Sequence, residues 1–426
     1  MNKYLWALID TTSTILFQFL GVIILARILT PEDYGIIGMM AIFISIGNLL
    51  VDSGMGGALI KKKNPNDTDY HTLFCFNLIV SLLFYLILYL SSNAIASFYD
   101  TPILSRCIKV YGLFVVISSF GIVQNTRLVK ELRFKELAII TIIAGVIGLI
   151  TAIILAVKDY GFWALIIQQL VFIAIRVGLQ TSVNRFKPKL QFSTDSFQEQ
   201  FKFGGSILLS NIISTIYTNI TSSIIPKISS VYQNGLYTQA SKIQQVPITI
   251  LTSVTDKVVF PLLTKMPNDA ELLTKARSIV RLTTPIFYIA ISLCVLLSKY
   301  IVLIILGEDW VMATPYLQIL FISGYGICHH YMARNIMKAT GNTSAFLKCT
   351  IIKSIIGIVI VLCTMQYGII YILWGFTIST YICSIVYAFY LKKASKYKYS
   401  QQITDLLPSI IIATTVTTIL IAYQLI

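Results

Sequence analysis

Charged residues are scarce in this sequence. Asp, Glu, Lys and Arg together make up 12% of the 426 residues, about half of the roughly 25% that is usual in a soluble domain. Hydrophobic residues make up 56%, and the mean hydropathy is +0.79. A water-soluble globule is therefore excluded, because so much apolar surface needs an apolar solvent. A bilayer requires roughly 20 apolar residues for each helical crossing, so the chain has room for a dozen or more crossings.

Several motifs of enzymes and metal proteins are also missing. The sequence contains no GxxxxGK[ST], GxSxG or HExxH pattern, so it offers no P-loop for ATP, no nucleophile elbow and no zinc-protease helix. The three histidines, His71, His329 and His330, form no ligand set, and the seven cysteines lie singly in apolar stretches. We therefore expect no enzyme activity, no cofactor, no metal site and no disulfide framework.

Apolar windows of about 19 residues predict an all-α polytopic membrane protein with 12–13 transmembrane helices. The seventh and eighth candidates are rich in Ser, Thr, Asn and Gln, so we expect them to face the protein interior rather than lipid. The first candidate, at residues 4–26, is too long for a signal-peptide core. The thirteen predicted spans are 4–26, 35–60, 72–98, 105–126, 136–157, 160–181, 203–226, 239–263, 282–306, 313–338, 345–366, 368–391 and 406–426.

The basic residues fall mainly on one side of these spans. If the N-terminus is cytoplasmic, 23 of the 33 Lys and Arg residues lie at cytoplasmic turns, and 5 lie at the opposite turns. This is a strong positive-inside pattern. The net charge of +15 is thus explained by topology and by anionic lipid headgroups, and no nucleic-acid surface is needed.

The longest polar segment divides the chain into two halves. We predict an N-terminal six-helix lobe at 1–181, a cytoplasmic linker at 182–202, a C-terminal six-helix lobe at 203–391, and a basic turn with a thirteenth helix at 392–426. Lobes with an even number of spans repeat in parallel orientation. A trace of such a repeat is visible, since RILTPEDYG at 27–35 and KISSVYQNG at 227–235 occupy the same outer turn of the two halves.

Three ionisable residues stand out inside the predicted spans. Arg176 and Lys353 lie one to two turns inside the membrane from the cytoplasmic side, and Asp10 lies in the first span. A central charge costs about 2.5–3.5 kcal/mol, so it needs a watery cavity or a partner. Arg and Lys match phosphate groups, which predicts a substrate with a phosphate or diphosphate. Asp10 is predicted to couple an ion or to pair with one of these cations.

Longer stretches of the sequence resemble a known family. The segment LARILTPEDYGIIGM at 25–39, followed by DSGMGGALIKKK at 52–63, is similar to bacterial polysaccharide flippases. These are O-antigen and capsule exporters of the multidrug/oligosaccharidyl-lipid/polysaccharide superfamily. Further matches spread over about three quarters of the chain, at 134–140, 161–170, 234–248, 258–263 and 306–320.

The resemblance implies a two-lobed, MATE-like transporter in the bacterial inner membrane. It would flip an undecaprenyl-diphosphate-linked oligosaccharide to the outer leaflet by alternating access, coupled to a proton or sodium gradient. The expected partners are the lipid-linked substrate, membrane lipids, and a polysaccharide polymerase with its chain-length machinery. Family members use cationic cavity residues for the diphosphate, in agreement with Arg176 and Lys353. Many relatives carry an acidic residue near the end of span 7, whereas 218–230 contains no carboxylate.

Two alternatives remain open at this point. A cation-coupled multidrug exporter shares the expected architecture, but it would need a carboxylate as its main internal charge. A membrane polysaccharide polymerase would need a long outer loop with catalytic basic residues, and the outer turns here are short and acidic.

Overall fold

The computed structural model describes residues 3–422, so the last four residues of the final predicted span, 406–426, lie outside the described residues. Every element of this part of the chain is helical. The chain folds into two compact units, unit 1 up to Lys227 and unit 2 from Ile228 onward. The all-α fold predicted from the sequence is thereby confirmed. The exact lobe and linker boundaries stay a prediction.

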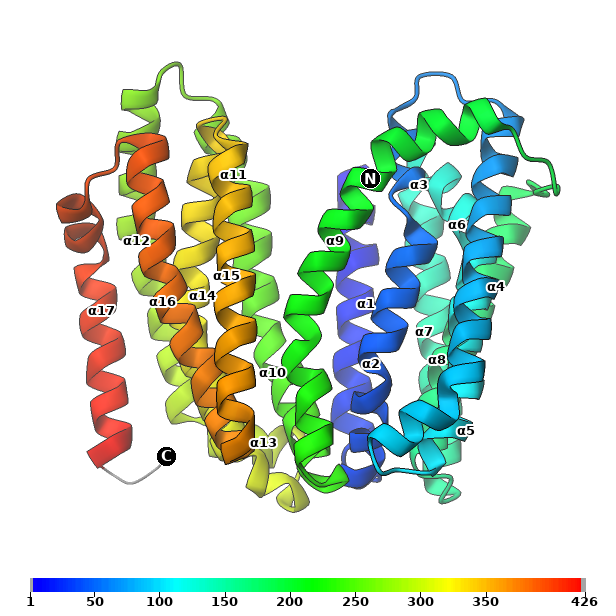
Figure 1. Ribbon diagram of the computed structural model, residues 1–426, viewed down its shortest axis with the longest axis horizontal. Coiled ribbons are helices and arrows are strands. Elements are labelled where there is room, and N and C mark those ends of the chain that lie inside the picture. The colour runs from blue at the N-terminus through cyan, green and yellow to red at the C-terminus, as the bar shows by residue number, and fades with distance from the viewer. Residues whose placement is uncertain (1–2, 423–426) are drawn as a thin grey trace. The chain divides into compact units, whose positions relative to one another are not determined.

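Unit 1 begins with a helix that packs on the seventh and continues with a broken second span (Figure 1). Its last helix, α9, begins within the segment predicted as a linker and extends one residue into unit 2. The helices are α1 (Lys3–Leu25), α2 (Pro31–Asp52), α3 (Met55–Lys61), α4 (Asp67–Phe98), α5 (Ile103–Tyr111), α6 (Leu113–Lys130), α7 (Phe134–Val157), α8 (Phe162–Asn184) and α9 (Thr194–Ile228).

Unit 2 is arranged around α14, which packs against α10, α12, α15 and α16. The helices are α10 (Val231–Val254), the π-helix η1 (Thr255–Val259), α11 (Phe260–Thr264), α12 (Asp269–Leu296), α13 (Ser298–Ile305), the 3₁₀ helix η2 (Glu308–Ala313), α14 (Thr314–Ala339), α15 (Thr343–Thr364), the 3₁₀ helix η3 (Met365–Tyr367), α16 (Ile369–Ser395) and α17 (Tyr399–Ala422).

Ten helical segments of the described chain are long and apolar enough to cross a membrane. The remaining long helices are α1, α9 and α10, which together with the ten correspond to the thirteen predicted spans. In α10 the polar side chains of Asn234, Gln239 and Gln244 are buried, as expected for a span too polar to face lipid. The chain is a multi-pass membrane protein.

The repeated nine-residue motif lies at the start of α2 in unit 1 and at the start of α10 in unit 2. Thr30 and Asp33 form a capping box at α2, with Pro31 in the first turn, and Ser230 and Gln233 form the same motif at α10. In both helices these side chains satisfy backbone N–H groups that have no partner within the helix. The two motifs therefore perform the same local function at corresponding places.

Both ends of helix α9 contact the other helices and turns of unit 1. Its first turns lie across one end of the unit, and the helix then bends to run along the bundle (Figure 1). Gly204 approaches the turn between α2 and α3 so closely that an added Cβ would lie 2.8 Å from backbone atoms of Gly54 and Met55. At the opposite end Lys227 pairs with Asp100 at 2.9 Å. Helix α9 is thus an integral part of unit 1.

Candidate functional site

Arg176 lies beside Asp10 within unit 1. The negative charge of Asp10 on α1 acts favourably on the guanidinium of Arg176 on α8, and Thr141 of α7 donates a hydrogen bond of 2.6 Å to the Asp10 carboxylate. Arg176 Nε is buried and has no hydrogen-bond partner among the described residues. The guanidinium therefore keeps a donor that can bind an anion or a water molecule.

Glycines allow these three helices to pack closely. A Cβ on Gly145 of α7 would lie 2.5 Å from the ring of Phe17 on α1, and one on Gly148 would lie 3.4 Å from Phe172 Cβ on α8. Residues 141, 145 and 148 share one face of α7 at helical spacing. The small residues thus bring α1 and α8 to the face that carries Thr141, which explains why Asp10 and Arg176 are neighbours.

Lys353 lies on α15 in unit 2, near a group of polar residues, which consists of His330 and Arg334 on α14 and Thr380 on α16. It is half-buried, and its charge acts on His330, Arg334 and Cys383. His330 is fixed by a 2.8 Å contact between its Nε2 atom and the Thr380 carbonyl oxygen and by stacking on Tyr387 at 4.9 Å. Lys353 and Arg176 belong to different units, so each has its own neighbours.

Asp256 and Arg334 form a bidentate ion pair that we did not expect from the sequence. The Arg334 Nη2 atom donates to the two Asp256 carboxylate oxygens at 2.6 and 2.7 Å, and the guanidinium lies over the Tyr331 ring at 4.4 Å. Asp256 belongs to the π-helix η1, a type of irregularity that is frequent at functional sites. In the sequence, the nearby Pro261 indicates that the helix is irregular, but it does not indicate that Arg334 is the partner of Asp256.

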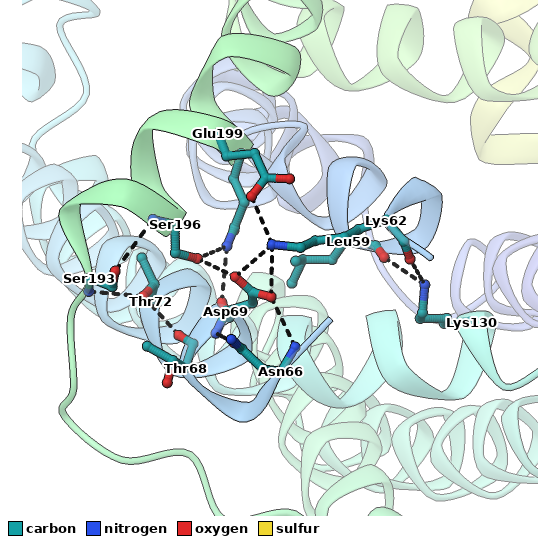
Figure 2. A network of polar contacts seen from close by, with 11 residues as sticks. Leu59, Lys62, Asn66, Thr68, Asp69, Thr72, Lys130, Ser193, Ser196 and Glu199 are labelled. Carbon is teal, nitrogen blue, oxygen red and sulfur yellow. Dashed lines mark hydrogen bonds and ion pairs between the residues drawn. The ribbon is translucent and has the colours of Figure 1, made fainter. Parts of the chain in front are cut away.

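A second polar network fixes the start of α9 on unit 1 (Figure 2). Lys62 donates to Asp69 at 3.2 Å and to Glu199 at 2.7 Å, and Ser196 donates to the buried Asp69 carboxylate at 2.6 Å. The pKa of Lys62 is raised above its usual value, mainly by the hydrogen bond to Glu199. Lys62 therefore stays charged throughout the physiological range.

Lys130 closes the C-terminal end of α3 in the same region (Figure 2). Its Nζ atom donates to the carbonyl oxygens of Leu59 at 2.9 Å and Ile60 at 3.1 Å, and also to that of Lys62. Cations at a helix C-terminus are favourable because the last carbonyl groups have no partner within the helix. Lys62 and Lys130, counted in the sequence as topology signals, thus have structural roles as well.

The comparisons with known proteins agree with the features above. The family model described as polysaccharide biosynthesis protein matches residues 24–315. The succinoglycan biosynthesis transport protein ExoT of Rhizobium meliloti is 24% identical over 75% of this chain, and the match spans 65% of the relative's own length. The lipid II flippase MurJ, in an inward closed conformation, is 14% identical with a TM-score of 0.74 over 99% of each chain. An inward-facing multidrug resistance MATE transporter is 14% identical with a TM-score of 0.66, over 92% of this chain and 98% of the other.

The two structural matches show the fold, and they confirm the MATE-like architecture expected from the sequence. The family model covers well over half of the residues, on both sides of the division between the two units. We conclude that the chain belongs to the family of polysaccharide biosynthesis proteins.

Proposed function

We propose that this protein flips an undecaprenyl-diphosphate-linked oligosaccharide from the cytoplasmic to the outer leaflet of the bacterial inner membrane by alternating access. The observation that carries the proposal is the buried Arg176 Nε, a guanidinium donor inside a membrane helix without a partner in the described chain. An unpaired donor there is costly. A diphosphate group would supply the missing acceptor.

The charges around Arg176 suit an exchange of partners. Asp10 is close enough to stabilise the guanidinium, so the cation tolerates its apolar surroundings when no substrate is bound. An incoming diphosphate carries more negative charge than one carboxylate, and the planar fork of Arg fits its oxygens. Asp10 would then act as the resting counter-ion, or as a proton or sodium site that couples transport to a gradient.

The polar group in unit 2 also contains cations. Arg334 is neutralised by Asp256, and the charge of Lys353 acts on the same group. Lys353 is the residue that we propose as the second contact to the diphosphate. A cationic drug would instead require an available carboxylate, and both Asp10 and Asp256 already have basic neighbours.

In the proposed orientation the N-terminus is cytoplasmic, because the turns that carry most of the Lys and Arg residues would then face the cytoplasmic leaflet. The flipped oligosaccharide would be used by a polysaccharide polymerase and its chain-length machinery.

The first prediction concerns transport of the lipid-linked oligosaccharide in inverted membrane vesicles. We expect Arg176→Ala and Lys353→Ala each to lower the flipping rate about tenfold or more, because each removes a charge-assisted contact. Lys348→Ala is the matched control, since Lys348 is an exposed cation on the same helix as Lys353. The double variant Asp10→Asn with Arg176→Ala avoids leaving a carboxylate without its cation.

Unchanged flipping in both single variants would refute the proposed diphosphate contacts. Efflux of a cationic dye by the same vesicles, without flipping of the glycolipid, would refute the proposed substrate and would favour the multidrug exporter.

A further inference from the structure

An open groove of about 390 Å³ lies on α12, away from the residues discussed so far. Thr274, Arg277, Ser278, Arg281 and Leu282 line it. These positions recur every three or four residues, so they form one face of the helix. The groove thus combines two guanidinium groups and two hydroxyl groups with the beginning of an apolar surface.

A single carboxylate holds both arginines. Asp405 of α17 accepts from Arg277 Nε at 2.7 Å, Arg277 Nη2 at 3.2 Å and Arg281 Nε at 2.5 Å. Tyr397 donates a further hydrogen bond of 2.6 Å. The Asp405 side chain is fully buried, whereas 55% of the Arg281 side chain is exposed. One carboxylate neutralises one of two cations, so the groove keeps a net positive charge that is accessible at Arg281.

Exposed apolar side chains continue from the groove along the same side of α12 and into α13. They are Leu282, Ile286, Ile289, Leu293, Leu297, Tyr300 and Ile304, each between 47% and 69% exposed. From 282 to 296 α12 rises about 21 Å at 1.5 Å per residue, and α13 continues the apolar surface after the break at Leu297, so the two helices together cover much of the roughly 30 Å of a bilayer's hydrocarbon. Arg277 and Arg281 therefore lie at one edge of the apolar layer, at the level of lipid headgroups.

We propose that this groove is a binding site for an anionic glycerophospholipid. The phosphodiester group would lie against Arg281 and the hydroxyl of Ser278, and an acyl chain would follow the apolar stripe from Leu282 toward Leu293. Basic pockets at the membrane edge of helices bind anionic headgroups in this way. The site is separate from Arg176 and Lys353 and does not depend on the proposed transport function.

A phospholipid fits the groove better than free phosphate does. The charged part of the site is open and shallow, and one excess positive charge holds a free anion only weakly in high dielectric. The adjoining stripe adds a contact that scales with the apolar surface covered. Selectivity should therefore require the negative headgroup and the acyl chain together.

The second prediction is tested by native mass spectrometry of the delipidated full-length protein with phosphatidylglycerol or phosphatidylcholine. We expect phosphatidylglycerol to bind about tenfold more tightly. Arg281→Gln should abolish most of this preference, and Ser278→Asp should do the same with both arginines in place, because it puts a carboxylate in the groove. Lys275→Gln is the matched control, since it removes an exposed cation from the same helix outside the groove.

Several outcomes would overturn the assignment. Equal retention of the two lipids would show that the groove does not select charge, and unchanged selectivity in Ser278→Asp would place the lipid elsewhere. Displacement of phosphatidylglycerol by an equal concentration of inorganic phosphate would assign the site to a free anion. Stronger competition by undecaprenyl diphosphate would assign it to the polyprenyl lipid. Unfolding midpoints of all variants identify any that fail to fold.

Discussion

At the scale of single residues, Asp405 shows how an ionised carboxylate is accommodated inside a helical bundle. Its side chain is fully buried, and two arginines and a tyrosine supply four hydrogen bonds to it. This coordination offsets the loss of hydration. It also joins α12 to α17, and this ionic contact adds to the packing of the C-terminal helix against α12.

The third prediction follows from this coordination. Asp405→Asn should lower the free energy of unfolding by about 3 kcal/mol, because two guanidinium groups lose their counter-charge. Denaturant titration in detergent measures the change. Asp100→Asn is the control: the Asp100–Lys227 pair is exposed at the surface, and its loss should cost less than about 1 kcal/mol. Equal effects of the two variants would contradict a special role for Asp405.

The sequence predicted part of the charged interior. It indicated Arg176, Lys353 and Asp10, because a charge within an apolar window is conspicuous. It did not indicate the pairing of Asp256 with Arg334 or of Asp405 with Arg277 and Arg281. These residues lie near the ends of apolar windows, where hydropathy cannot separate a charge that faces water from one that pairs with a residue 78 or more positions away.

At the scale of elements, the crossing of α9 over the turn between α2 and α3 depends on two glycines. Gly54 has a positive φ of 68°, which favours glycine. Gly204 faces it with no room for a side chain, since the nearest atoms belong to the backbone and cannot rotate away. The position of α9 is thus determined by backbone contact, with the Lys62–Asp69–Glu199 network beside it.

The fourth prediction tests this crossing. Gly204→Ala should destabilise unit 1 and should increase hydrogen exchange in the first turns of α9, because the new Cβ would overlap the backbone of Gly54. Gly178→Ala is the matched control within α8, where nothing lies within 4 Å of an added Cβ. It should be neutral or stabilising by up to about 1 kcal/mol. Unchanged exchange in Gly204→Ala would contradict the close contact.

At the scale of the whole molecule, hydropathy predicted the long helices well, because a chain in lipid must satisfy its backbone groups within each helix. It did not predict the interruptions. The predicted span 35–60 is broken at Ser53 and Gly54, which both have positive φ. The predicted span 282–306 starts thirteen residues after the observed start of α12, because the first turns of this helix are charged and fall outside the apolar window. These features depend on close packing and on capping, which apolar windows do not report.

The fifth prediction concerns the orientation of the chain. In a background without the exposed Cys363, a membrane-impermeant thiol reagent should label Asp309→Cys in intact cells and Lys63→Cys only after the cells are opened. Both positions are exposed, and the positive-inside pattern puts them on opposite sides. The reverse labelling pattern would invert the topology and, with it, the proposed direction of transport.

The π-helix η1 has a consequence for length variation among relatives. Each residue of an α-helix turns the chain by about 100°, and a π-helix accommodates one residue more than regular winding would allow. In a relative with one residue fewer between Thr255 and Val259, α10 would be rotated about its own axis. A different face of α10 would then lie toward α14. The relative's counterpart of Asp256 would then point away from Arg334, so a deletion there and the loss of that arginine should occur together.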